Sequence, residues 1–335
     1  MGGGPYDALE VEAPEAYQVI QRDGDNLADI TIRGFVRRQG TYTLEASFNG
    51  GAYADIVAEQ SWPDSFEGTL SGQAAGQGTL TVRLKGTSYT DTVEYIGIGD
   101  VFMIAGQSNA VGCYTNAQSY SHATRKAGLF ANSYQWKELI DHTDDATDAV
   151  DAISADVPSY AGSVWPVLAT LYLADMGGIP CAFVPCAAGG TFVANWVPGA
   201  DHLNRNTLYG SMNYKSLVIG GCKAVLWHQG ESDALNDFGE FYNASLDLLA
   251  NGIGADMGVP LLATVLQQFP GATTEAIAAV NAAITEAIGD NANVVAGPDL
   301  SDLDTTPDSF HFKSNEQAAI VAGRWWTAIK AAFGW

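Results

Sequence analysis

Five short apolar segments alternate with helical patterns over the part of the chain that follows Gly99. Each segment is apolar throughout rather than at every second position, as expected for a strand that is buried on both faces. Strands that alternate with helices form a parallel sheet covered by helices, so we predict an α/β domain. The predicted strands are 101–105, 181–185, 224–227, 261–266 and 294–296, and the predicted helices are 165–176, 238–251, 274–288 and 313–333.

The segment before Gly99 has a different pattern. Short alternating stretches, such as 30–32 and 80–84, are separated by clusters of glycine and asparagine. Short strands at this spacing are typical of a small antiparallel sandwich. We therefore predict an all-β sandwich domain over residues 1–97, with an accessory role, followed by the α/β domain over residues 98–335.

The charge balance narrows the range of partners. The chain has 38 acidic and 15 basic residues, for a formal net charge of −23. Nucleic acid and anionic membranes need clustered Lys and Arg, so neither is expected as a partner. No apolar stretch reaches the length of a membrane span. The glycine-rich residues 1–4 resemble an added leader that could replace a native signal, and we expect an extracellular or periplasmic protein.

The chain has four cysteines. They form no C-x-x-C pair, and their spacing does not resemble that of a zinc site. Three of them lie in or beside apolar segments, which favours buried free thiols. A bridge between Cys181 and Cys186 is the alternative. The four are Cys113, Cys181, Cys186 and Cys222.

A serine follows the first predicted strand of the α/β domain. Residues 106–109 read Gly-Gln-Ser-Asn. Ligands of open parallel sheets bind at the carboxyl ends of the strands, so Ser108 lies where an activated nucleophile would be placed. The alternative is a structural role, in which Ser108 caps the helix that follows.

His311 is the second element of a candidate site. A serine hydroxyl needs a base with a pKa near 7, and the imidazole of histidine meets that need. The base needs an acceptor that fixes its tautomer, and Asp308 can provide it if the loop turns back on itself. The alternative is an aspartate at a helix N-terminus beside a surface histidine.

Polar residues also follow two other predicted strands. Residues 227–233 read Trp-His-Gln-Gly-Glu-Ser-Asp, in which Gln229 has an amide donor suited to an oxyanion hole and Glu231 could orient a histidine. The segment 186–191 contains Gly190, whose backbone N–H could approach a ligand closely. The alternatives are a loop that caps a helix and an ordinary glycine turn.

Together these segments resemble the conserved blocks of the SGNH hydrolase superfamily, in the branch of carbohydrate acetylesterases similar to sialate O-acetylesterases and acetylxylan esterases. The resemblance extends from about Gly99 to Trp335. It implies a flavodoxin-like α/β/α sandwich and hydrolysis of O-acetyl esters without a metal or cofactor. It also implies that Ser108 is the nucleophile, His311 the base and Asp308 the acid, with Glu231 as the competing acid.

The oxyanion donors implied by the resemblance are the backbone N–H groups of Ser108 and Gly190 and the side chain of Gln229. The expected substrate is an acetylated carbohydrate, with xylan and sialic acid as candidates, and the expected reaction passes through an acyl-enzyme. Candidate substrate-binding residues are Asn109, Trp196 and His228. The competing functions are a non-catalytic glycan-binding or structural module that retained the fold, and a lipid or thioester hydrolase.

Overall fold

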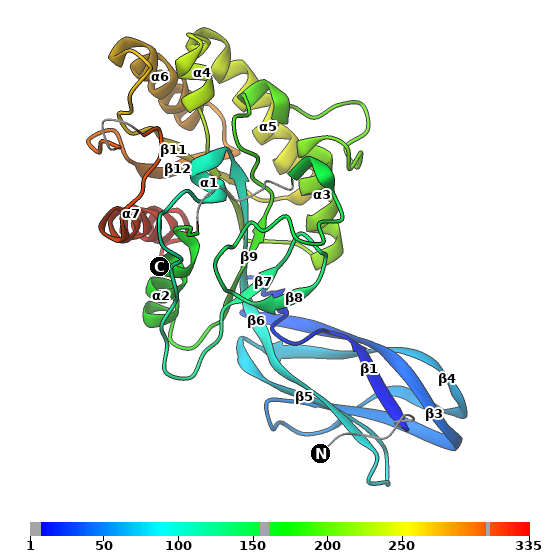
Figure 1. The fold of residues 1–335 in the computed structure, drawn as a ribbon. Coiled ribbons are helices and arrows are strands. Elements are labelled where there is room, and N and C mark those ends of the chain that lie inside the picture. The colour runs from blue at the N-terminus through cyan, green and yellow to red at the C-terminus, as the bar shows by residue number, and fades with distance from the viewer. Residues whose placement is uncertain (1–7, 155–160, 306–308) are drawn as a thin grey trace.

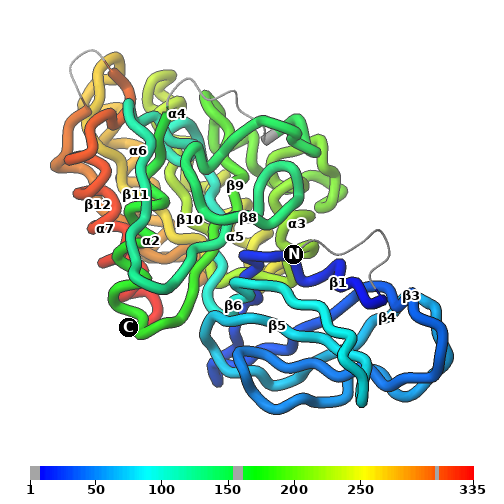
Figure 2. The backbone as a smooth tube through the Cα atoms, turned by 60° about the horizontal axis from the view of Figure 1, so that its bottom comes forward, coloured from blue at the N-terminus to red at the C-terminus, as the bar shows by residue number. Residues whose placement is uncertain are grey.

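The computed structural model describes residues 8–154, 161–305 and 309–335. A β-rich part at the N-terminus leads into a part in which strands and helices alternate (Figures 1 and 2). The strands are β1 Leu9–Ala13, β2 Val19–Gln21, β3 Leu27–Phe48, β4 Ala54–Ala74, β5 Gly76–Leu84, β6 Thr90–Gly106, β7 Gly128–Phe130, β8 Trp136–Glu138, β9 Cys181–Pro185, β10 Ala224–His228, β11 Leu261–Val265 and β12 Val294–Asp299.

Helices occupy much of the second part of the chain (Figure 1). They include the four that the sequence predicted, which correspond to α2, α5, α6 and α7, and a further long helix, α3, that it did not. The helices are α1 Ser108–Val111, α2 Trp165–Asp175, α3 Leu208–Ile219, α4 Glu231–Leu235, α5 Gly239–Met257, α6 Thr274–Asp290 and α7 Asn315–Phe333, and the 3-10 turns are η1 Ala152–Ser154 and η2 Val193–Trp196.

All five predicted apolar strands are present and pair in parallel. Their order across the sheet is β9-β6-β10-β11-β12, with β7 and β8 beyond β9. In this order the chain moves first to one side of β6 and then to the other. Such a reversal opens a crevice at the carboxyl ends of the strands, where ligands of open α/β sheets bind.

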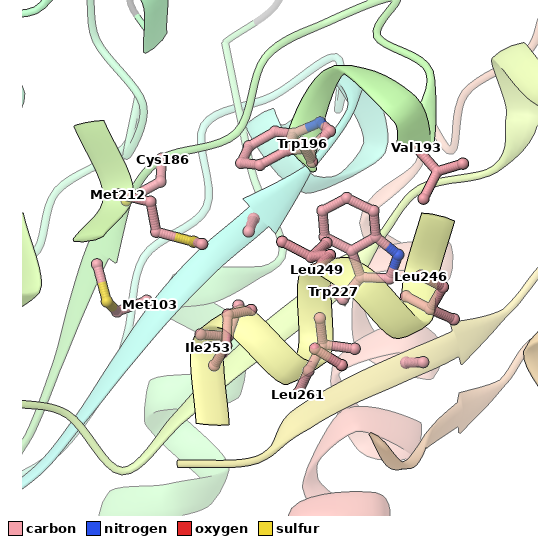
Figure 3. Close-up of a cluster of buried hydrophobic side chains, with 14 of the residues drawn as sticks. Met103, Cys186, Val193, Trp196, Met212, Trp227, Leu246, Leu249, Ile253 and Leu261 are labelled. Carbon is pink, nitrogen blue, oxygen red and sulfur yellow. The ribbon is translucent and has the colours of Figure 1, made fainter. Parts of the chain in front are cut away.

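Side chains of β6 point alternately into two hydrophobic clusters, one on each face of the sheet. Val101 and Met103 belong to the cluster that includes side chains of α3, α5 and α6. Phe102 and Ile104 belong to the cluster that includes side chains of α2 and α7. Figure 3 shows part of the first cluster. Because both faces are buried, residues 101–105 of β6 are apolar at every position.

The N-terminal strands form a curled sheet. One edge of β3 pairs with β4, and its other edge pairs with β1 and then with β5. β6 pairs with β5 and then continues into the parallel strands, so the twelve strands among the described residues join in one mixed sheet. The separate sandwich that the sequence predicted is therefore not confirmed. The domain boundary after residue 97 falls inside β6 and stays a prediction.

A buried ion pair joins the two parts of the chain beside β6. Arg22 Nη2 lies 2.7 Å from Asp100 Oδ2, and Arg22 Nε donates to Asp100 Oδ1 at 3.0 Å. The hydroxyl of Tyr172, on α2, donates to Asp100 Oδ2 at 2.6 Å. The carboxylate therefore links the strand that leads to Ser108 with both the N-terminal segment and α2.

The cysteines agree with the sequence analysis. All four are buried and outside any disulfide, and the alternative bridge between Cys181 and Cys186 is not formed. Burial raises the pKa of the Cys186 thiol to about 12, so it stays protonated at neutral pH. Within the described ranges, no helix combines the length and apolar character needed to cross a membrane.

Candidate active site

The candidate site begins where β6 meets the end of β10. Gly106, the last residue of β6, has φ +126°, and a Cβ atom there would lie 2.1 Å from the carbonyl oxygen of His228. The next residue, Gln107, donates its backbone N–H to that same oxygen at 3.0 Å. Glycine is required because the two backbones come this close. The turn after β6 is thereby held against the loop that follows β10.

Ser108 lies directly after this turn, at the first position of α1. The residue at the N-cap is Gln107, whose side chain makes no capping bond, so Ser108 does not cap this helix. Ser108 Oγ and His311 Nε2 are 2.8 Å apart, although the two residues are 203 positions apart in the chain. The structure thus brings together the serine and the histidine that were singled out from the sequence.

The environment of His311 favours a neutral imidazole. Burial lowers the pKa of His311 below its usual value, and the positive charge of Lys313 acts in the same direction. The negative charge of Glu231 partly opposes both effects. An imidazole that is neutral at pH 7 can accept a proton from a hydroxyl. Asp308, the predicted acid, lies outside the described residues.

Gln107 connects the loops around Ser108. Its Oε1 atom accepts hydrogen bonds from Gln229 Nε2 at 3.1 Å and from the backbone N–H of Ser232 at 3.1 Å. Gln229 Nε2 also donates to the carbonyl oxygen of Thr191 at 2.9 Å and to Asp233 Oδ2 at 2.6 Å. These contacts join the loops after β6, β9 and β10.

The same contacts bear on the role predicted for Gln229. Its side chain is fully buried, and its two amide protons are shared among three acceptors inside the protein. This arrangement does not support a direct role as an oxyanion donor. Gly190 differs, because it is exposed, has φ +70°, and has no atom of the described residues within 4 Å of the position of a Cβ. Its backbone is open to an approaching ligand.

The three candidate substrate-binding residues are all buried. Trp196 packs edge-on against Trp227, with ring centroids 5.2 Å apart (Figure 3). His228 Nε2 lies 3.3 Å from Gln267 Oε1. The Asn109 side chain is enclosed by protein atoms. The structure therefore does not support direct contact between these side chains and a substrate.

Glu231, the competing acid, is 2% exposed. Its Oε1 atom accepts a hydrogen bond from Asn109 Nδ2 at 2.6 Å and lies 3.5 Å from His228 Nε2. Burial lowers the pKa of His228, while the charge of Glu231 opposes that shift. We interpret His228 as a neutral core histidine on the grounds of its burial.

In the part of the chain that the structure describes, no group of three or more His, Cys, Asp or Glu residues could hold a metal ion.

Sequence reasoning missed three polar residues near the site: Gln107, Asp233 and Gln267. Gln107 lies within the Gly-Gln-Ser-Asn segment, and its position directly before Ser108 could have indicated that it lies near the site. Asp233 is the last residue of the segment 227–233, and the many polar residues of that segment could have indicated a place near the site. Gln267 follows β11 and carries no comparable signal, because its neighbours along the chain do not form a motif.

The architecture and the site can now be described together. This is an α/β protein with helices on both faces of a parallel sheet and a serine–histidine pair near the carboxyl end of its first parallel strand. Residues 98–326 match the family of carbohydrate esterases described as sialic acid-specific acetylesterases. The match covers well over half of the chain, so this protein belongs to that family. The acetylesterase resemblance seen in the sequence is confirmed.

Individual relatives support the fold. A carbohydrate acetylesterase from Xanthomonas citri superimposes with a TM-score of 0.61 at 20% identity, over 96% of this chain and 74% of that chain. A protein from Arabidopsis thaliana gives a TM-score of 0.54 at 23% identity, over 70% and 98%. A probable carbohydrate esterase from Arabidopsis thaliana is 40% identical over 81 residues, which span 24% of this chain and 30% of that relative.

Proposed function

We propose that this carbohydrate esterase is a serine enzyme that removes O-acetyl groups from an oligo- or polysaccharide. The observation that carries the proposal is the 2.8 Å contact between Ser108 Oγ and His311 Nε2. A nucleophile within hydrogen-bond distance of its base is the central requirement for activating a serine hydroxyl. The lowered pKa of His311 supports the same role, because only the neutral imidazole accepts the proton.

In the proposed reaction, Ser108 Oγ attacks the acetyl carbonyl carbon as His311 Nε2 takes the hydroxyl proton. The tetrahedral intermediate then collapses, and the sugar alcohol leaves with the proton from His311. Water, activated by the same imidazole, attacks the acetyl-serine and releases acetate. Asp308 is proposed to accept a hydrogen bond from His311 Nδ1 and so to stabilise the imidazolium.

We propose two backbone donors for the oxyanion. The N–H of Ser108 belongs to the first turn of α1, where amide protons have no partner within the helix. The N–H of Gly190 lies on an open glycine turn. Gln229 supports this arrangement by holding the neighbouring carbonyl of Thr191, rather than by touching the substrate. Each donor is expected to lower the barrier by about 3 kcal/mol.

The catalytic domain is proposed to comprise residues 98–335, with the N-terminal residues 1–97 as an accessory domain. The parallel strands support a flavodoxin-like sandwich. Numbered along the chain, the strands β9-β6-β10-β11-β12 have the order 2-1-3-4-5, which is the flavodoxin-like order. The family description also favours sialic acid as the carbohydrate, although acetylated xylan is a candidate.

The first test replaces the nucleophile. Ser108→Ala should abolish hydrolysis of an aryl acetate, whereas Ser71→Ala, on an exposed position of β4, should retain it. Substantial turnover by the Ser108→Ala protein would refute the serine mechanism. The wild-type protein should also be labelled on Ser108 by a fluorophosphonate, as mass spectrometry of its peptides would show.

The second test concerns the substrate. Hydrolysis should be measured side by side as acetate release from O-acetylated sialic acid, acetylated xylan and an acetylated bacterial polysaccharide. For a long-chain aryl ester the released phenol is measured, and for a thioester the released thiol. Preference for any acetylated carbohydrate supports the proposal. Preference for the long-chain ester or the thioester would favour the lipid or thioester hydrolase that was considered from the sequence. Binding of a glycan without any acetate release would favour the non-catalytic module.

A further inference from the structure

One amide side chain holds the backbone on both sides of His311. Asn109 Nδ2 donates to the carbonyl oxygen of Phe310 at 3.4 Å, and the backbone N–H of Phe312 donates to Asn109 Oδ1 at 3.3 Å. These contacts cross 201 and 203 positions of the chain. Because Asn109 directly follows Ser108, the same short turn positions both the serine and the backbone that carries its histidine.

Glu231 determines which way this amide faces. Its carboxylate can only accept hydrogen bonds, so the atom of Asn109 that meets it at 2.6 Å must be the NH₂ group. The amide oxygen then faces the N–H of Phe312, which donates a hydrogen bond to it. Hydrogen bonds to a carboxylate are also stronger than neutral ones. The burial of both side chains excludes the water that could otherwise compete for these groups.

The remaining contacts of Glu231 are longer than its contact with Asn109. Gln267 Nε2 donates to Glu231 Oε1 at 3.2 Å, and His228 Nε2 lies 3.5 Å from the same oxygen. The other oxygen, Oε2, accepts no hydrogen bond within the described residues. Glu231 therefore makes its one short contact, 2.6 Å, with Asn109. That contact leads directly to the segment that carries His311.

We infer that Glu231 and Asn109 form a positioning pair, in which the carboxylate orients the amide and the amide holds the backbone of His311 so that the imidazole meets Ser108. This inference rests on the proposed function. It gives Glu231 a role that differs from that of an acid bonded to the imidazole. It also replaces the substrate-binding role that the sequence suggested for Asn109.

A double-mutant cycle tests whether Glu231 acts through Asn109. Asn109→Ala and Glu231→Gln should each lower kcat for an aryl acetate by about 10- to 100-fold with little change in KM, because misplacement of a catalytic group by 1 Å has effects of this size. With Asn109→Ala already present, Glu231→Gln should lower kcat by less than about threefold more. Losses that multiply in the double variant would overturn the inference, because they would show that the two residues act independently.

A pH profile separates positioning from charge. Glu231 raises the pKa of His311 through its negative charge, and Lys313 opposes it. Glu231→Gln should therefore move the acidic limb of the kcat/KM profile to lower pH, both in the wild-type background and in the Asn109→Ala background. The fall in the pH-independent kcat caused by Glu231→Gln should instead be large when Asn109 is present and small in the Asn109→Ala background. A variant that shifts the limb but keeps the wild-type plateau would show that charge alone matters.

Gln267→Met is the matched control. It removes a hydrogen bond from the same carboxylate but leaves the Asn109 contacts with Phe310 and Phe312 intact. This variant should lose stability in thermal unfolding while its kcat stays within about threefold of wild type. A loss of kcat equal to that of Glu231→Gln would overturn the inference.

Two further measurements keep the result clear. If Glu231→Gln does not fold, Asn109→Asp provides a second test, because it replaces the donor by a carboxylate facing Glu231. It should lower kcat at least as much as Asn109→Ala, and wild-type kcat would overturn the inference. Ser108→Ala distinguishes failure of the proposed function from failure of the positioning pair. Turnover without Ser108 refutes the proposed function, whereas an inactive Ser108→Ala protein with a multiplicative cycle refutes the positioning pair alone.

Discussion

Replacing Gly106 by alanine should disturb both the stability of the protein and the site. Gly106 has φ +126°, which an alanine rarely adopts. The added Cβ would lie 2.1 Å from the carbonyl oxygen of His228 and 2.6 Å from its carbonyl carbon. Both atoms belong to the backbone of a buried strand, so neither can move without separating β6 from β10.

The magnitude follows from three effects. Backbone strain at such a φ costs about 1–3 kcal/mol. Relief of the clash requires the strands to part by about 1 Å, and this weakens the bond from the Gln107 N–H to His228 O, at a cost of about 1 kcal/mol. Disrupted packing around the buried strand ends adds to these, so we expect a total loss of about 3–5 kcal/mol in the free energy of unfolding.

Gly258→Ala is the matched control, because Gly258 also has a positive φ, +68°, but has open space around its Cβ position. It should cost about 1–2 kcal/mol through strain alone. Urea denaturation, compared at equal m-values, measures both losses. The displaced turn should also lower the kcat of Gly106→Ala by about 100-fold, while Gly258→Ala keeps wild-type kcat. Equal losses of stability in the two variants would refute the reasoning from the strand contact.

Two further predictions concern charged groups. Asp100→Asn leaves the buried Arg22 without its counter-charge and should lower the free energy of unfolding by about 3–5 kcal/mol in urea denaturation; a loss below about 1 kcal/mol would contradict the importance of this pair. The acidic limb of kcat/KM should lie below pH 6.5, because burial and Lys313 lower the pKa of His311 and activity requires its neutral form. Lys313→Met should move that limb to higher pH, and an unchanged or lower midpoint would exclude the proposed effect of its charge.

Local patterns were sufficient for much of the fold. The five apolar strands were predictable because buried strands are mostly apolar, and the observed bounds of β9 and β10 agree with the prediction to within one residue. The helix α3 was missed because it is buried on most sides, including the polar residues Asn213 and Lys215, and has no clear amphipathic pattern. The continuity of β6 between the two parts of the chain also had no local signal.

The candidate site shows the same division. The residue types in the Gly-Gln-Ser-Asn segment and around His311 indicated a nucleophile and a base, because the chemistry of a serine hydroxyl requires a partner such as imidazole. Only the tertiary structure determined that these two side chains lie 2.8 Å apart. It also buried Trp196 and His228, which the sequence had suggested for substrate binding.

Asn109 shows most clearly what the sequence could not determine. Its position beside Ser108 indicated that it would lie near the site, but a sequence position does not give the direction of a side chain. The structure directs this amide inward, toward Glu231 and the segment around His311. Local periodicity reports whether a residue is buried, whereas hydrogen bonds between distant segments depend on how the whole chain packs. Local sequence patterns therefore indicated most of the elements and the chemical groups, and the tertiary packing determined their partners.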